Sequence, residues 1–220
     1  MNYFAHGRAF VGDPYFLAGT AVPDWLAVVD RRVRVRAKHV EPYTRCDAVD
    51  GDWRLATIAR GIAQHHADDA WFHATLAFHE LSTDFTGRIR ALLPSDGGHR
   101  ASFLGHILVE LLLDDVLIAE DPARLEAYYA SIERLDFTVV EQAINRIAPR
   151  STDRLAWFIE RFSAERFLWD YRDDARLLFR LNQVMQRAAL PPLPETFRDF
   201  FGEARDLVRE RRDSLLTPEE

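Results

Sequence analysis

The chain has 220 residues, of which 48% are hydrophobic, and it carries a formal net charge of −7. These values suit a single globular domain over residues 1–220, and the acidic balance argues against a nucleic-acid-binding protein. The single cysteine, Cys46, excludes an internal disulfide framework. We find neither a signal peptide nor an apolar stretch long enough to span a bilayer, and we therefore expect a cytoplasmic protein.

Nearly every segment has apolar residues three and four positions apart, and none alternates as a strand does. We therefore predict an all-α fold, a single-domain helical bundle. The expected helices lie, in chain order, near 2–10, over 23–39, over 52–66, then as another helix or a bent continuation to 93, over 100–118, from 122 onward, from a cap at Ser151 onward, over 173–189, and finally up to about 216. Breaks are expected at 41–51, 94–99 and 190–194.

Five basic residues stand close together near the N-terminal end of this acidic chain. They are Arg31, Arg32, Arg34, Arg36 and Lys38. One interpretation is the solvated face of a helix. The other is a docking surface for an anionic group or an acidic partner.

An apolar stripe marks one face of the predicted helix over 52–66. It consists of Leu55, Ile58, Ala59 and Ile62. Further along the same face, polar residues replace apolar ones, with His65, Asp69 and His73 at successive intervals of four. Residues at this spacing lie above one another on a helix, so two such side chains can reach one ion.

The predicted helix over 100–118 repeats this arrangement. His106, Glu110 and Asp114 stand four residues apart, while leucine, isoleucine and valine occupy nearly every other position. A helix that is apolar all round is a buried helix, and a buried carboxylate must be paired, protonated or bound to a metal. The two His-x3-acid pairs therefore predict a buried divalent-metal site, for which manganese, zinc and iron are the candidate ions.

Other polar residues are candidates beside these pairs. His6 lies in an otherwise apolar segment, and Asp24 follows a proline, where an aspartate commonly caps a helix. His66 and His73 are candidates for proton transfer or for orienting a metal ligand. The remaining histidines have the context of surface or loop residues: His39, His79 and His99.

Short motifs are spread along most of the chain. They are Met1-Asn2-Tyr3-Phe4-Ala5-His6, the segment from Gly19 to Trp25, Gly61-Ile62 followed by His65 and Asp69, Glu110 followed by Asp114, Phe167-Leu168-Trp169-Asp170-Tyr171, and the stretch from Leu181 to Arg187. In this order they resemble the bacterial acyl carrier protein phosphodiesterases, distant relatives of the HD-domain metallohydrolases.

The resemblance implies an HD-domain-like fold and removal of phosphopantetheine from holo-acyl carrier protein. It adds two residues to the expected metal ligands, which become His6, Asp24, His65, Asp69, His106 and Glu110. Candidate catalytic groups are Asp69, His66, His73 and Asp114. The basic residues 31–38 would dock the acidic carrier protein. The sequence HHADDAWFH lacks the basic pair and Thr-Asp usual in the family, Glu110 replaces an aspartate, and residues 41–53 have no counterpart.

Two alternatives remain open at this point. His6 with the two His-x3-acid pairs also resembles the zinc-dependent phospholipases C and related single-strand nucleases, which are usually exported and begin with a free tryptophan. A helical binding or scaffold protein that keeps the fold without catalysis is the second alternative.

Overall fold

The computed structural model describes residues 1–45, 51–94 and 97–217, and these ranges contain helices and no strand. The predicted all-α fold is confirmed for them. Cys46 and parts of the predicted breaks at 41–51 and 94–99 lie outside the described residues. Within those residues, no helix is long and apolar enough to cross a membrane.

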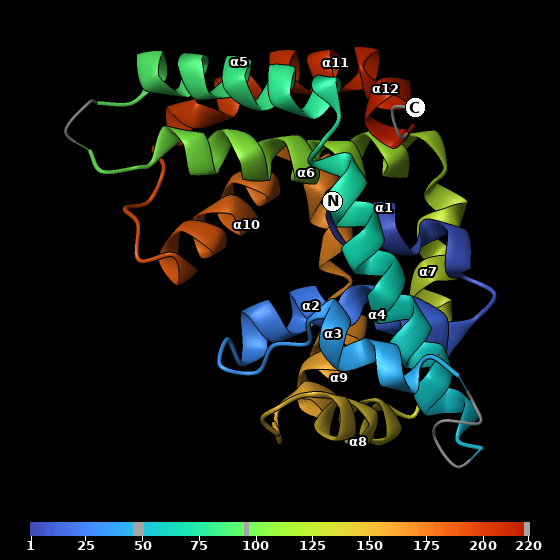
Figure 1. Ribbon diagram of the computed structural model, residues 1–220. Helices are drawn as coiled ribbons and strands as arrows, with labels where there is room; N and C mark the ends of the chain where they lie inside the picture. Colours follow the sequence, from blue (N-terminus) through green and yellow to red (C-terminus); the bar gives the residue numbers. More distant parts are fainter. Residues whose placement is uncertain (46–50, 95–96, 218–220) are drawn as a thin grey trace. The chain divides into compact units, whose positions relative to one another are not determined.

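The elements follow one another along the chain as Figure 1 shows. The α-helices are α1 (Tyr3–Gly7), α2 (Pro14–Val29), α3 (Ala37–Val40), α4 (Trp53–Phe72), α5 (Leu76–Leu92), α6 (Ala101–Glu120), α7 (Pro122–Glu133), α8 (Phe137–Ile147), α9 (Leu155–Glu165), α10 (Asp174–Arg187), α11 (Phe201–Glu210) and α12 (Arg212–Leu216). Short 3-10 helices are η1 (Arg8–Phe10), η2 (Glu41–Tyr43), η4 (Phe167–Arg172) and η5 (Glu195–Phe200).

The helices gather into two compact units, each built from separate stretches of the chain. Unit 1 comprises Met1–Asn2, Trp71–Asp121 and Phe167–Glu220, and unit 2 comprises Tyr3–Ala70 and Pro122–Arg166. Unit 2 therefore contains α1 to α3, most of α4, and α7 to α9. Unit 1 contains α5, α6 and α10 to α12.

Helix α2 corrects the predicted helix over 23–39 at both ends. It begins nine residues earlier, where the Asp13 carboxylate caps the helix by accepting from the Phe16 N–H at 3.2 Å, and it ends at Val29. Pro23 lies inside α2. A proline there removes one helical hydrogen bond, but the surrounding residues are packed, and the helix continues. Asp24 is therefore not an N-cap.

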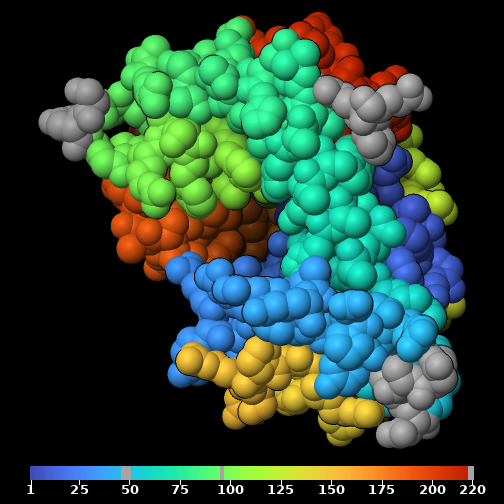
Figure 2. Space-filling view, in the orientation of Figure 1, coloured from blue at the N-terminus to red at the C-terminus, as the bar shows by residue number. Residues whose placement is uncertain are grey.

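The stretch between α2 and α3 is not helical, which is the second correction to that prediction. Arg31 and Arg32 lie in a turn, and residues 33–36 follow it without helical structure. Val33 and Val35 are buried, while Arg32, Arg34 and Arg36 before, between and after them are exposed. This alternation is the period of extended backbone. Of the five basic residues only Lys38 lies in a helix, α3, so they do not form one helix face, and the stretch lies at the surface of unit 2, in blue in Figure 2.

Two glycines let the backbones of α2 and α4 touch inside unit 2. A Cβ atom on Gly61 would lie 2.2 Å from the carbonyl oxygen of Phe16, and one on Gly19 would lie 2.4 Å from that of Ile58. Only glycine permits so close an approach of two backbones. The crossing places the middle of α4 beside the first half of α2.

Replacing Gly61 with alanine is expected to lower the free energy of unfolding by about 1–3 kcal/mol, because the added methyl group meets backbone atoms that have no room to shift. Gly87 in α5 is the matched control, since nothing lies within 4 Å of a Cβ placed there. Gly87→Ala is expected to stabilise the protein by about 0.5–1 kcal/mol. Urea denaturation measures both. If Gly61→Ala and Gly87→Ala changed the free energy of unfolding in the same direction, the close contact between α2 and α4 would be contradicted.

The N-terminus of α9 shows that the predicted cap at Ser151 is wrong. The helix begins at Leu155, and the Ala156 N–H is satisfied by the Glu141 carboxylate of α8 at 3.0 Å. The preceding turn is held by Asn145, whose side chain donates to the Thr152 carbonyl and accepts from the Thr152 N–H, both at 2.8 Å.

In unit 1, α6 is the central helix and contains a buried carboxylate. Asp115 has no exposed surface and pairs with two guanidinium groups, that of Arg172 at 2.5 Å and that of Arg205 from α11. Arg205 also contacts Asp174 at 2.7 Å. Packing of α6 against α5 is close, because a Cβ on Gly105 would lie 2.8 Å from the Ser82 carbonyl oxygen.

Candidate metal centre

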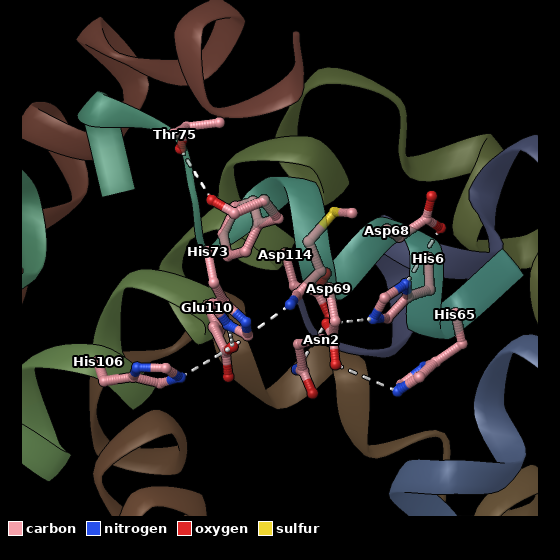
Figure 3. Close-up of polar contacts among 12 residues, drawn as sticks. Asn2, His6, His65, Asp68, Asp69, His73, Thr75, His106, Glu110 and Asp114 are labelled. Carbon is pink, nitrogen blue, oxygen red and sulfur yellow. Dashed lines mark hydrogen bonds and ion pairs between the residues drawn. The ribbon is translucent and has the colours of Figure 1, made fainter. Parts of the chain in front are cut away.

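Three of the predicted metal ligands come together in unit 2. His6 on α1 and His65 and Asp69 on α4 each offer one ligand atom, and these atoms lie within 4.8 Å of one another. The Nε2 atom of His6 is 3.2 Å from Asp69 Oδ1, and that of His65 is 3.3 Å from Asp69 Oδ2. The two imidazole rings stack with their centroids 4.2 Å apart. Figure 3 shows both rings directed at the carboxylate. We call these three residues the unit 2 triad.

The opposite ring nitrogens of both histidines have partners of their own. His65 Nδ1 is 2.9 Å from the carbonyl oxygen of Thr20, and His6 Nδ1 is 3.3 Å from Asp68 Oδ2. Because a carbonyl oxygen can only accept, Nδ1 of His65 is the donor to Thr20, which leaves Nε2 as the ring nitrogen that faces Asp69. Metal-binding histidines in proteins are typically held in this way. Gln64 in turn donates to Asp68 at 2.7 Å, which fixes the partner of His6.

The two histidines of the unit 2 triad are shielded from solvent, and burial and the neighbouring charges together shift the pKa values of His6 and Asp69. His6 and His65 are 1% and 3% exposed. Burial alone would lower the pKa of His6, but the carboxylates of Asp68 and Asp69 outweigh it and raise the pKa to about 9. Burial alone would raise the pKa of Asp69, yet His6 and His65 hold it well below its usual range. The carboxylates of Asp68 and Asp69 therefore favour a positive charge at His6, which in the metal-free protein is the protonated imidazole.

Asp24 on α2 interacts electrostatically with the three residues of the triad, although its carboxylate is not among the ligand atoms that lie within 4.8 Å of one another. Its Oδ2 atom is buried and has no hydrogen-bond partner among the described residues. Burial raises the pKa of this carboxyl, and the imidazoles of His65 and His6 oppose the rise. A buried carboxylate oxygen without a partner is costly, and it is a candidate for a fourth ligand. His6 Nε2 is likewise buried and poorly aligned for a hydrogen bond with Asp69.

A second group of potential ligands lies in unit 1. His106 and Glu110 face each other on α6, as their spacing predicts, and the third member is His73 rather than Asp114. The Nε2 atoms of His73 and His106 lie 2.9 Å and 3.3 Å from the same Glu110 oxygen, Oε1. We call these three residues the unit 1 triad.

The unit 1 triad is more open than the unit 2 triad. The side chains of His106 and His73 are 41% and 33% exposed, and that of Glu110 is 13% exposed. Burial alone would raise the pKa of Glu110, but the Met1 amino group and the two imidazoles lower it. Both histidines converge on one oxygen, and no carbonyl or carboxylate holds their other ring nitrogens in the described contacts. The unit 1 triad is therefore less well preorganised for metal binding than the unit 2 triad.

The other predicted catalytic residues have structural partners. Asp114 is fully buried and accepts from the Asn2 side chain at 3.0 Å, and Asn2 also donates to the Tyr171 hydroxyl at 3.1 Å. His66 Nε2 donates to the Val35 carbonyl at 2.8 Å, and burial lowers its pKa. Asp114 and His66 therefore belong to neither triad.

The predicted ligands thus divide between the units. His6, His65, Asp69 and Asp24 belong to unit 2, and His106 and Glu110 belong to unit 1. Comparison of the chain with protein-family models, curated proteins and solved structures finds no match.

Proposed function

We propose that the protein is a metal-dependent phosphodiesterase whose catalytic ion is held by His6, His65 and Asp69, with Asp24 as a fourth ligand. The observation that supports this most strongly is the arrangement of the ring nitrogens. His65 and His6 each have Nδ1 engaged, at 2.9 Å by the Thr20 carbonyl and at 3.3 Å by Asp68, and direct Nε2 at Asp69. Two imidazoles with carboxylate oxygens suit manganese, iron or zinc.

The chemistry follows from these ligands. A divalent ion bound there would lower the pKa of a water molecule and polarise a phosphoryl oxygen. His6 gives up its proton when such an ion replaces it, and Asp68, fixed by Gln64, keeps the ring in place. Asp69, which is about one-third exposed at its side chain, lies at the open side of the triad. It is the ligand that is best placed to contact water or substrate.

The substrate is proposed from the resemblance to acyl carrier protein phosphodiesterases. Holo-acyl carrier protein would lose phosphopantetheine by cleavage of its phosphodiester. Acyl carrier proteins are acidic, and the exposed side chains of Arg32, Arg34 and Arg36 suit such a partner. We propose the unit 1 triad as a second and weaker metal site. Its His73, His106 and Glu110 would bind an ion only after losing their contacts with one another.

Metal analysis and an activity assay test this proposal together. Protein purified without chelator is expected to contain manganese, iron or zinc, and added manganese or zinc is expected to raise the melting temperature of chelated protein. Hydrolysis of bis-p-nitrophenyl phosphate and of holo-acyl carrier protein is expected to require the metal. His65→Ala should abolish both effects, whereas His79→Ala, at an exposed position of α5, should change neither.

The alternatives give different results in the same experiment. Metal binding without hydrolysis of either substrate would favour a non-catalytic binding protein. Hydrolysis of the small diester without turnover of the carrier protein would reject the proposed substrate but not the chemistry. Absence of both metal binding and metal-dependent stabilisation would reject the proposed function.

A further inference from the structure

Unit 2 has a pocket whose lining contains no residue of the unit 2 triad. It has a volume of about 410 Å³ and is lined by Asp30, Arg32, Val33, Pro149, Arg150 and Ser151. Two segments form it, the start of the extended stretch after α2 and the turn between α8 and α9. Its volume falls within the range of small-molecule sites, roughly 300–1,000 Å³. The size suits a small ligand rather than a folded partner.

Asp30 anchors the first guanidinium of the pocket. Its Oδ1 atom accepts from Arg32 Nε at 3.2 Å and from the Arg32 backbone N–H at 3.3 Å. Asp30 is 8% exposed, whereas the Arg32 side chain is 77% exposed. The described contacts engage only Nε of the guanidinium, so the two Nη groups remain available to another acceptor. Arg32 also lowers the pKa of Asp30, which keeps the anchor ionised.

The second guanidinium comes from Arg150. Among the described residues it has no ion-pair or side-chain hydrogen-bond partner, and it is exposed. Its turn is rigid on both sides, because Pro149 precedes it and Asn145 holds Thr152 by two hydrogen bonds of 2.8 Å. Ser151 adds a hydroxyl donor between these fixed points. The donors therefore need little reordering to meet a ligand.

The charge of the pocket is positive in an acidic protein. Arg32 and Arg150 contribute two positive charges against the one negative charge of Asp30, while the whole chain has a formal charge of −7. Arg154 adds to the positive potential, since its charge helps to lower the pKa of Asp30. Such a local excess of guanidinium groups attracts anions.

We infer that this pocket binds the phosphoryl group of a small organic phosphate, through the Nη groups of Arg32, the guanidinium of Arg150 and the Ser151 hydroxyl. Planar guanidinium groups match phosphate oxygens in pairs. Two of them with a hydroxyl offer more donors than the two oxygens of a carboxylate can use, whereas a phosphoryl group has three oxygens and a higher charge. The proposal does not require the metal or the phosphodiesterase activity.

The pocket has a physical connection to the unit 2 triad. The extended stretch that contributes Arg32 and Val33 continues to Val35, whose carbonyl accepts from His66 at 2.8 Å. His66 is the neighbour of the proposed ligand His65 on α4. A phosphate that orders this stretch would therefore act on the same turn of α4 that holds the triad.

Phosphate titration of metal-free protein tests the inference. Chelated protein is titrated with inorganic phosphate, glycerol 3-phosphate and acetate at constant ionic strength, with calorimetry as the readout. We expect saturable binding of both phosphates with a Kd of about 1 mM or lower, because a few charge-assisted hydrogen bonds supply the binding free energy that this Kd requires. Acetate is expected to bind at least about tenfold more weakly, by the loss of one such bond.

Charge-matched variants separate the pocket from general electrostatic attraction. Arg150→Gln and Arg32→Gln are each expected to weaken phosphate binding about tenfold or more. Arg60→Gln, which removes the same charge from an exposed position of unit 2 outside the pocket, should leave it unchanged. Equal weakening by Arg60→Gln, equal binding of acetate, or no saturation would each overturn the inference.

Metal affinity distinguishes this inference from the proposed function. Arg150→Gln should bind manganese or zinc as the unaltered protein does, because Arg150 contacts no member of the triad. Loss of phosphate binding with unchanged metal affinity in this variant supports a separate pocket. Parallel loss of both would show that the observed phosphate binding reports the metal site, and would overturn the inference while leaving the metal site in place.

Discussion

Replacing Asp69 with asparagine is expected to reduce the affinity of the unit 2 triad for manganese or zinc by more than about 100-fold. The carboxylate of Asp69 lies 3.2 Å and 3.3 Å from the two histidine Nε2 atoms and contacts both of them. An amide keeps the shape but removes the charge that favours a cation. Even the loss of a group that only orients a ligand typically costs about 10–100-fold. Calorimetric titration of chelated protein measures the change.

Replacing Asp68, the hydrogen-bond partner of His6, should reduce metal affinity less than replacing Asp69 does. Asp68→Asn is expected to weaken metal binding by about 10–100-fold, because the carboxylate of Asp68 orients His6 without belonging to the triad. Asp84→Asn is the matched control, since Asp84 forms an exposed ion pair with Arg88 on α5. It should leave metal binding unchanged. Equal losses for all three variants, or none, would contradict the assigned roles.

The contact between His65 and Asp69 could be predicted from the sequence. Both residues lie on one helix at a spacing of four, and local geometry alone brings them together. His6 and Asp24 could not be placed by spacing, because they reach the same site from α1 and α2 through the packing of unit 2. The resemblance to a known family proposed these two residues. The structure shows His6 in the triad, while Asp24 interacts with the triad electrostatically and is not one of its members.

His73 shows why spacing can mislead at the end of a helix. The sequence places it four residues after Asp69, on the same predicted face. In the structure α4 ends at Phe72, and Thr75 starts α5 by accepting from the Phe78 N–H at 3.2 Å. His73 therefore leaves the axis of α4 and meets Glu110 instead. Thr75 was the available sequence signal, since threonine is a common N-cap.

The basic stretch after α2 has the period of extended backbone and not the helical period that its sequence suggests. Five basic residues within eight positions resemble a helix face, and the helical period of the rest of the chain favours that interpretation. Val33 and Val35 alternate with arginines, and both valines are buried. This short alternation is visible in the sequence, but only the burial of the two valines in unit 2 shows that the segment is not a helix. Asp13-Pro14, a recognisable helix start, was the missed signal for α2.

Replacing Arg205 with alanine is expected to lower the free energy of unfolding by about 3 kcal/mol, near the lower end of the range for breaking a buried ion pair. The cost arises from Asp115, which is fully buried on α6 and would retain only Arg172 as a partner. Arg209→Ala is the control, because this residue of the same helix pairs with Asp206 at the surface. Exposed pairs contribute about 0–1 kcal/mol. Urea denaturation measures both.

A double variant separates the cost of an unpaired charge from the value of the ion pair itself. In Asp115→Leu with Arg205→Met, both buried charges are replaced by apolar side chains of similar volume. Stability is expected to return to within about 1 kcal/mol of the unaltered protein, because such replacements are often neutral or stabilising. If the double variant were as unstable as Arg205→Ala, the ion pair would be stabilising unit 1 by itself. Recovery would instead mean that Arg205 is required chiefly because Asp115 is present, as a buried carboxylate in a helix packed against α5 and α11.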